Sequence, residues 1–387
     1  MTTESVLEEW LHRCIRCSTC KYVFRQYSPS CPSGEFYRFE SYWASGRLAL
    51  GRGLKMNELD WSDDIAEALF TCTTCGSCEE QCQAPHARSI VKIIEEVREQ
   101  YVQKVGPLPR HKAFADNVAE HHNPYGNTHH ARGIVAECGL PTRADTAFFI
   151  GCTSNYRETS IRDAAISIMK KANVDFTVVD EHCCGSPLLR TGQTDSVLEL
   201  AKHNLAQFEA AGCRRIVTAC AGCYRTLTQE YPGLLGSFDI EIVHLSQMIK
   251  ELIKDGSLSI ESEFPGHFTY HDPCHLGRHG GVYEEPRDVM RLLRLDVSEM
   301  SLNRANAWCC GAGGGVRSAF RDMAESTARE RIRQAETIGA DHVITCCPFC
   351  VNNLTSSSDG EVDVSDLVEI VDRMSVANPR QRARESE

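Results

Sequence analysis

Cysteine is the residue type in this sequence with the clearest capacity for chemistry. The chain has twenty-one cysteines among 387 residues, and eighteen of them fall into four regularly spaced groups. Thiols inside cells are normally kept reduced, and a reduced thiol can ligate metal because the thiolate is the metal-binding form. The acidic N-terminal segment has no signal-peptide pattern, which disfavours a secreted disulfide framework. The cysteine pattern therefore predicts metal or cluster ligation.

The first two groups have the spacing of ferredoxin-type ligands. Residues 14–20 read CIRCSTC, with a Cys-Pro pair at 31–32, and residues 72–82 read CTTCGSCEEQC. In such a run, three closely spaced thiolates surround one cubane and the last cysteine ligates the other cluster. A zinc site would have to explain three cysteines at two-residue gaps occurring twice. We predict two cubane [4Fe-4S] clusters, one held by Cys14, Cys17, Cys20 and Cys82 and the other by Cys72, Cys75, Cys78 and Cys31.

The other two groups contain five cysteines each, including one adjacent pair. The first comprises Cys152, Cys183, Cys184, Cys220 and Cys223, and the second comprises Cys274, Cys309, Cys310, Cys347 and Cys350. A cubane takes four protein thiolates. Five thiolates with a doublet therefore suggest a cluster opened away from the cube.

These five-cysteine groups belong to two tandem copies of one unit. TAFFIGC ending at Cys152 corresponds to FTYHDPC ending at Cys274, HCCG corresponds to WCCG, and CAGC corresponds to CPFC, with offsets of 122, 126 and 127 residues. In each copy, short apolar runs alternate with helical patterns, which predicts an α/β layer with a mainly parallel sheet. Ligands of such sheets sit beyond the carboxyl ends of the strands. Cys152, Cys220, Cys274 and Cys347 all follow predicted strands.

The predicted fold is an α+β multidomain protein. A mainly helical, ferredoxin-like two-[4Fe-4S] module spans 1–104, a linker spans 105–145, two tandem α/β domains span 146–258 and 259–374, and a disordered tail spans 375–387. The first module closes with an amphipathic helix between Ser89 and Val105, whose apolar face carries Ile90, Ile93, Ile94, Val97 and Tyr101.

Charge and hydropathy limit the partners. The net charge of −12 gives no electrostatic reason to expect nucleic acid. No stretch approaches the ~20 apolar residues that span a bilayer. We expect a cytoplasmic protein that meets a membrane only through a partner subunit.

The doubled pattern C-x(n)-CCG-x(~35)-C-x2-C resembles the cysteine-rich CCG domains of heterodisulfide reductase, and residues 1–104 resemble that enzyme's small two-cubane subunit. Their fusion is similar to its membrane-linked catalytic subunit, which is designated D, and to related CCG-domain iron–sulfur oxidoreductases. The resemblance covers about residues 10–354. It implies one noncubane [4Fe-4S] cluster in each CCG domain, fed with single electrons by the two cubanes, and a disulfide cleaved between the two noncubane clusters. It makes the adjacent pairs Cys183, Cys184, Cys309 and Cys310 the candidate catalytic residues.

The resemblance also allows a second function. Some relatives are non-catalytic relays that link a flavoprotein or cytochrome to another oxidoreductase, in lactate, glycolate, acyl-CoA, aromatic-CoA or sulfite metabolism. Two complete five-cysteine motifs favour disulfide reduction. No flavin fingerprint is visible, so the expected partner is a flavoprotein or a membrane cytochrome b, with a small disulfide or thiol as substrate.

Several residues outside the four groups have both a functional and a structural interpretation. The glycine-rich run at 311–315 is interpreted as backbone that approaches a cluster or substrate closely. His182 and His275, which flank cluster cysteines, could donate to sulfur or deliver a proton, or could simply pack. Arg190 and Arg317 could bind an anionic substrate. The remaining residues are interpreted as structural or surface positions: Cys138, Cys213, Cys346 and the pairs His121/His122 and His129/His130.

Overall fold

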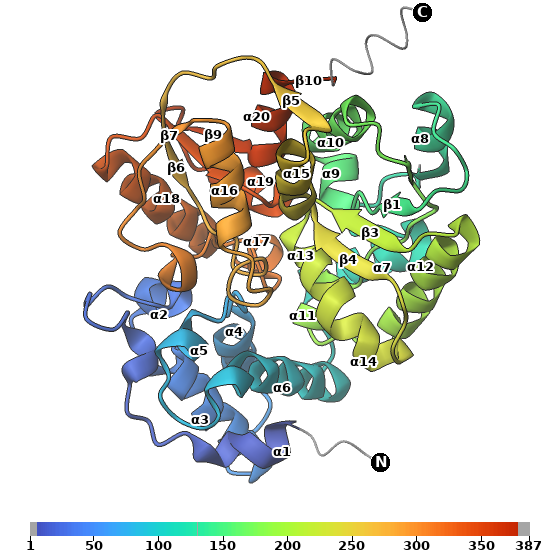
Figure 1. Ribbon diagram of the computed structural model, residues 1–387. Coiled ribbons are helices and arrows are strands. Elements are labelled where there is room, and N and C mark those ends of the chain that lie inside the picture. The colour runs from blue at the N-terminus through green and yellow to red at the C-terminus, as the bar shows by residue number, and fades with distance from the viewer. Residues whose placement is uncertain (1–5, 130, 378–387) are drawn as a thin grey trace, which may run out of the picture.

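The structure is a computed structural model that describes residues 6–129 and 131–377. Three lobes meet at the centre of the molecule (Figure 1). The N-terminal lobe lies at the bottom in blue, the first repeat on the right in green and yellow, and the second repeat on the left in orange and red. Among the described helices, none has the length and apolar character needed to cross a bilayer.

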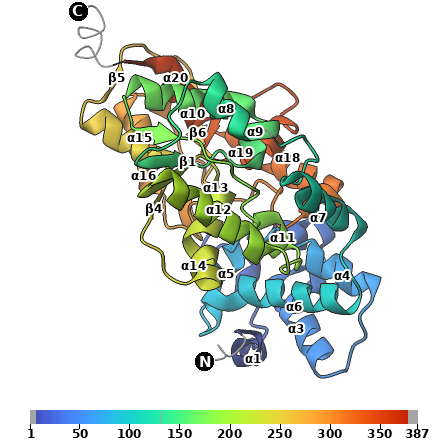
Figure 2. The same ribbon diagram turned by 90° about the vertical axis from the view of Figure 1, so that its right-hand side faces the viewer.

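The N-terminal lobe is mainly helical, as predicted. Its helices are α1 (Val6–Trp10), α2 (Pro32–Tyr37), α3 (Ala44–Lys55), α4 (Asp63–Phe70), α5 (Ser77–Gln81) and α6 (Ile90–Lys104), with short 3-10 turns between them. The predicted apolar face of α6 is buried against Leu48 and Phe70. Figure 2 shows α6 between the N-terminal helices and α11 of the first repeat, so this helix joins the two lobes.

The region at 105–145 differs from the predicted linker. It contains α7 (Pro109–His121) and α8 (Ala131–Glu137). Pro109 occupies the first turn of α7, where its missing N–H costs nothing. In α7 only His111 and Val118 are buried, so the apolar periodicity is too weak to reveal the helix in the sequence.

The first repeat has the predicted parallel sheet. Its strands are β1 (Thr146–Phe148), β2 (Phe176–Thr177), β3 (Arg215–Thr218) and β4 (Glu241–His244), in the order β2-β1-β3-β4. All neighbouring pairs run parallel. The helices are α9 (Cys152–Tyr156), α10 (Thr159–Lys171), α11 (Ser186–Arg190), α12 (Val197–Ala211), α13 (Ala221–Arg225), α14 (Tyr231–Leu235) and α15 (Leu245–Lys254).

The second repeat has an equivalent parallel sheet. Its strands are β6 (His267–Tyr270), β7 (Asp296–Val297), β8 (His342–Thr345) and β9 (Asp363–Asp366), in the order β7-β6-β8-β9. The helices are α16 (Glu284–Leu292), α17 (Val316–Ala319), α18 (Arg321–Thr337), α19 (Pro348–Thr355) and α20 (Leu367–Met374). As expected for parallel sheets, the chain passes from strand ends directly into cysteine-bearing loops.

The two repeats pack against each other through equivalent helices. Helix α15 of the first repeat packs on α16 of the second, and α20 of the second packs on α10 of the first. The strands that follow α15 and α20 also pair with each other, β5 (Leu258–Ile260) antiparallel to β10 (Ser375–Ala377). The repeats are thus related by an approximate two-fold arrangement.

The predicted disordered tail begins too early. Residues 375–377 form β10 because their backbone hydrogen-bonds with β5, a partner more than a hundred residues earlier that no local pattern reveals. Residues 378–387, the rest of the predicted tail, lie outside the described residues.

Candidate iron–sulfur sites

The cysteines of the first ferredoxin-type group line one cavity. Cys14, Cys17, Cys20 and Cys82 border it together with His86. Cys82 lies at the C-terminal end of α5. The other three cysteines lie in the segment that follows α1, where Cys20 belongs to the short 3-10 turn Thr19–Lys21. Nε2 of His86 lies 3.9 Å from the sulfur of Cys82. The structure therefore brings together the four residues predicted to hold one cubane, including Cys82, which belongs to the other ferredoxin-type run.

Two cysteines of the second ferredoxin-type group, Cys31 and Cys72, lie near the buried Arg47. Cys31 directly precedes α2, and its sulfur lies 4.0 Å from Nη1 of Arg47. Burial raises the pKa of the Cys72 thiol, and the charges of Arg47 and Arg98 oppose that rise, while the negative charge of Cys31 adds to it. Cys78 interacts with Cys72 and Cys75 in turn. Cationic neighbours favour the thiolate, the form in which cysteine binds metal.

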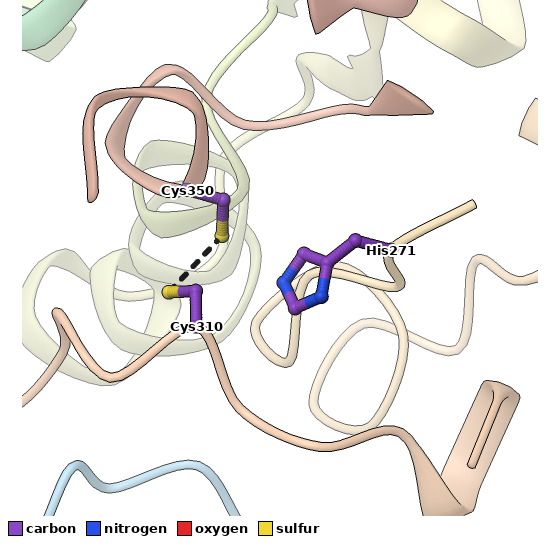
Figure 3. Close-up of side chains that lie close together, drawn as sticks. All are labelled: His271, Cys310 and Cys350. Atoms are coloured by element: carbon purple, nitrogen blue, oxygen red, sulfur yellow. Dashed lines mark hydrogen bonds between the residues drawn. The ribbon is translucent and has the colours of Figure 1, made fainter. Parts of the chain in front are cut away.

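Within each repeat, the five predicted cysteines form a series of neighbours in which each thiol influences the pKa of the next. In the first repeat these interactions run along Cys152, Cys183, Cys184, Cys223 and Cys220. In the second repeat they run along Cys274, Cys309, Cys310, Cys350 and Cys347. The sulfurs of Cys310 and Cys350 are 3.4 Å apart (Figure 3). Each repeat thus assembles one all-sulfur donor set, the chemistry that iron–sulfur clusters require.

Two further contacts connect the sets to one another. Cys220 of the first repeat interacts with Cys347, its equivalent in the second repeat. Cys75 of the N-terminal lobe interacts with Cys309 of the second repeat. Interactions between neighbouring thiols therefore run from the second ferredoxin-type group through the second repeat and into the first.

The glycine-rich run lies against the N-terminal lobe, in agreement with its interpretation as close-approach backbone. A Cβ on Gly314 would lie 2.3 Å from the carbonyl oxygen of Cys72, and one on Gly313 would lie 2.7 Å from that of Thr73. Both contacts are with backbone, which cannot move aside cheaply. The run therefore lets the second repeat sit directly on a predicted cluster-binding loop.

Arg98 forms hydrogen bonds with all three lobes beside the glycine-rich run. It is fully buried on α6, and it donates to the carbonyl oxygens of Leu69 and Cys72 in its own lobe. It also donates to the carbonyl oxygens of Arg190 in the first repeat, at 2.6 Å, and Gly314 in the second, at 3.2 Å. Arg98 is not recognisable from the sequence, because a lone arginine in an amphipathic helix gives no sign that it is buried.

The second repeat places a histidine beside its cysteine doublet. Ligand atoms of His271, Cys310 and Cys350 lie within 4.8 Å of one another, and all three residues are buried (Figure 3). Nδ1 of His271 accepts from Nε of Arg331 at 3.1 Å, so Nε2 carries the proton and is free to donate to Cys310. The equivalent residue of the first repeat is Phe149. The two sites are therefore chemically different.

The first repeat has its own distinctive group, a buried glutamate. The carboxylate of Glu181 accepts from the backbone N–H groups of Ile150 at 2.8 Å and Gly151 at 2.7 Å. Burial raises the pKa of Glu181 to about 8, and these two hydrogen bonds act against the rise. The equivalent residue of the second repeat is Ala307. Glu181 fixes the turn that leads into Cys152.

Both arginines suggested as anion binders are engaged within the protein. Arg190 is buried and forms ion pairs with Glu95, at 2.7 Å, and Glu230. Arg317 donates to Asn353 and Ser356. A role in binding an anionic substrate is therefore wrong for Arg190, because its charge is already neutralised by two carboxylates.

The histidines suggested by the sequence have packing partners. The ring of His182 stacks between those of His122, at 3.7 Å, and His203, at 3.5 Å, and His129 contacts Asp180. His275 Nε2 accepts from Arg225 at 3.3 Å. His122 and His129 therefore join a half-buried cluster rather than a free surface segment. His130 lies outside the described residues.

The three cysteines outside the four groups belong to the hydrophobic core of the repeats. Cys213 and Cys346 are buried, and Cys138 is half-buried against the same core. Their packing role agrees with the sequence interpretation.

Comparison with known proteins defines the class. The family described as "Cysteine-rich domain" matches residues 146–228 and 268–355, and the "4Fe-4S dicluster domain" matches residues 10–85. The protein is thus an iron–sulfur protein of the CCG-domain class, and the dicluster domain supports two cubane clusters in the N-terminal lobe.

Individual relatives are more specific. In Methanosarcina acetivorans, the relative is the subunit designated D of dihydromethanophenazine:CoB–CoM heterodisulfide reductase, which is 33% identical with 93% of each chain covered. In Methanothermobacter marburgensis, it is the subunit designated B of a CoM/CoB fumarate reductase, which is 32% identical over 80% of this chain and 62% of that one. The chain belongs to the family of the D-type subunits of heterodisulfide reductase.

A solved structure shares the fold. A hypothetical protein from Helicobacter pylori matches with a TM-score of 0.59 at 12% identity, over 85% of this chain and 67% of the other. This likeness shows the fold alone.

Proposed function

We propose that this protein is the cluster-bearing catalytic subunit of an oxidoreductase complex that reduces a disulfide, or runs in the reverse direction. The observation that carries the proposal is the series of neighbouring thiols, each of which influences the pKa of the next, from Cys75 through Cys309 to Cys347 and Cys220. The heterodisulfide reductase relative, which is covered over 93% of its length, supports the same chemistry.

The chain's own residues hold and separate the clusters. Two cubanes would bind to the N-terminal cysteines in the crossed arrangement, and one noncubane cluster would bind to the five cysteines of each repeat. When bound, these clusters supply one-electron transfer. Eight of the ten cysteines in the two five-cysteine sets are buried, and Cys152 and Cys274 are half-buried. This burial would limit the access of water while two single electrons reach one disulfide.

The electrons and protons balance simply. Reduction of a disulfide R–S–S–R′ consumes two electrons and two protons and gives two thiols. The electrons come from a redox partner, for which a flavoprotein or a membrane cytochrome b is the proposed class. The protons come from solvent.

The first experiment tests both cofactors and reaction. The anaerobically purified protein is expected to contain about sixteen iron atoms, four for each of four clusters. With reduced methyl viologen as artificial donor, it should reduce the CoM–CoB heterodisulfide or another low-molecular-weight disulfide. Sixteen irons without any disulfide-dependent viologen oxidation would contradict the catalytic proposal.

A relay role is the second candidate, and one comparison favours it. A relative from Syntrophomonas wolfei, 29% identical over 76% of this chain and 44% of its own length, is named EtfAB:quinone oxidoreductase, so members of this kind also serve other oxidoreductases. A relay would accept electrons from viologen and pass them to a partner enzyme while leaving all disulfides unreduced.

A further inference from the structure

The aromatic loop, which we define as residues 15–39, exposes an unusual amount of apolar surface. Among the described residues, eleven large hydrophobic side chains are exposed, and six lie in this short segment: Ile15, Tyr22, Phe24, Tyr27, Phe36 and Phe39. Tyr27 is 89% exposed and Phe24 is 72% exposed. The blue chain beside α2 projects from the left edge of the molecule in Figure 1. Gathered apolar surface of this kind marks a site of interaction.

The same loop is basic, although the protein as a whole is acidic. It holds one acidic residue, Glu35, and four basic residues, a net charge of +3 within a chain of −12; the basic residues are Arg16, Lys21, Arg25 and Arg38. Lys21 and Arg38 are paired with carboxylates. Arg25 forms no ion pair within the described part of the chain, and its guanidinium lies 5.2 Å from the ring centre of Phe24. Its charge is therefore available to a partner.

The tip of the aromatic loop has an unfavourable backbone conformation that neighbouring residues hold in place. Arg25 and Tyr27 both have left-handed backbone, with φ of 64° and 56°. This conformation is unfavourable for a residue with a Cβ. The tip is fixed from below, because Val23 is buried against Trp308 and the N–H of Phe24 donates to Gln81 at 2.9 Å. Strain maintained in this way is typical of functional segments.

The aromatic loop also lies beside the first cubane site. Cys17 is exposed, whereas the other seventeen cysteines of the four groups are buried or half-buried. Cys17 borders the cavity shared by Cys14, Cys20 and Cys82, and the loop continues directly from it. A protein docked on the loop would therefore have direct access to Cys17, the exposed cysteine of the four groups.

We propose that the aromatic loop is the docking surface for a redox protein with an acidic face, which passes single electrons to the cluster held by Cys14, Cys17, Cys20 and Cys82. This inference rests on the proposed function, since it names the surface used by the electron-donating partner. Charge decides the occupant, because a cationic, aromatic surface selects an acidic counterpart and repels the same loop of a second copy.

The test uses the cluster-loaded protein and a small acidic clostridial-type ferredoxin as the probe. Stopped-flow absorbance measures cluster reduction by the reduced ferredoxin and, separately, by reduced methyl viologen, which needs no docking surface. For the wild type, the ferredoxin rate constant should fall several-fold as salt rises, because screening weakens the attraction. Phe24→Ser/Arg25→Glu should lower that rate constant about tenfold at low salt.

The matched control removes one exposed apolar side chain and reverses one exposed charge elsewhere in the chain. Val105 and Arg110 are both exposed and far from residue 25 in the sequence, so Val105→Ser/Arg110→Glu should keep the wild-type ferredoxin rate. Iron content and the viologen rate should be unchanged in both variants, which shows that they fold and carry clusters.

Two results would overturn the inference. One is an equal ferredoxin rate in the loop variant and the wild type. The other is loop-dependent binding to phosphatidylglycerol vesicles without any effect on ferredoxin, which would assign the loop to a membrane surface. Failure of the proposed function is distinguishable, because it would appear as absent disulfide reduction even with viologen as donor.

Discussion

Cys220 and Cys347 interact across the interface of the two repeats, and they are equivalent positions of the repeated unit. Each lies two residues after the end of its strand, β3 or β8, at the N-terminus of α13 or α19. The approximate two-fold packing of α15 on α16 and of α20 on α10 brings these strand ends together. The two five-cysteine sets consequently adjoin instead of lying on separate domains.

The first prediction concerns the doublet of the second repeat. Cys310→Ala removes the thiol that lies between Cys309 and Cys350, so the second noncubane cluster should lose its open form. The unusual paramagnetic signal expected when a thiol binds the oxidised enzyme should disappear, and disulfide reduction should fall to background. Viologen should still reduce the two cubanes.

Electron paramagnetic resonance measures the thiol-dependent signal, and a disulfide assay measures the activity. Cys138→Ala is the control, since Cys138 belongs to no cluster group. Wild-type disulfide reduction in Cys310→Ala would place the chemistry elsewhere.

The second prediction tests the crossed ligands of the cubanes. Cys82 borders the cavity of Cys14, so Cys82→Ala and Cys14→Ala should damage the same cluster. The double variant should lose about four irons, the same as either single variant. Combining Cys82→Ala with Cys72→Ala should instead remove about eight irons. Iron analysis distinguishes these losses. A larger loss in the Cys14/Cys82 double variant than in the Cys72/Cys82 double variant would mean that Cys82 ligates the same cluster as Cys72.

The third prediction uses the difference between the repeats at His271. His271→Phe copies the first repeat, which has Phe149, and removes the N–H that faces Cys310. Hydrogen bonds to sulfur raise the reduction potential of an iron–sulfur cluster. One bond worth about 1 kcal/mol corresponds to a lowering of about 40 mV for a one-electron couple. A potentiometric titration followed by paramagnetic resonance measures this shift. His267→Phe, at the other end of β6, is the control and should leave the potential unchanged.

The fourth prediction concerns acid stability. Burial lowers the pKa of His111 to about 4, while its Nε2 lies 3.0 Å from the carbonyl oxygen of Gly315. In the unfolded chain the ordinary pKa is about 6.5, so between these values the unfolded state binds a proton that the folded state does not. Stability therefore falls as the pH drops, by about 2 kcal/mol from pH 7 to pH 5.

Chemical denaturation at several pH values measures that dependence. His111→Gln retains a side-chain N–H for Gly315 but does not titrate. The loss of stability between pH 7 and pH 5 should therefore be about 2 kcal/mol smaller in this variant than in the wild type. His12→Gln, an exposed position, is the control. An unchanged slope in His111→Gln would show that other groups account for the acid sensitivity.

The sequence alone predicted the cysteine groups, the repeat and the type of most main elements. Thiolate spacing is local, so the ferredoxin-type runs and both CCG motifs are visible without a fold. The strands at 146–148, 215–218 and 342–345 and the helix at 90–104 also come from local periodicity and agree with the structure. The helix α7 and the strand β10 were missed because α7 buries few side chains and β10 depends on pairing with distant β5.

Only the tertiary structure decided how the sites relate to one another. The interactions of Cys75 with Cys309 and of Cys220 with Cys347 join residues 234 and 127 positions apart in the sequence, and they depend on the packing of three lobes. The burial of Arg98, the ion pairs that occupy Arg190 and the position of His271 beside Cys310 depend on the same packing. Short-range patterns encode what each segment can bind. Which segments meet is set by long-range burial, since the favourable free energy of burying apolar surface exists only once distant parts of the chain have come together.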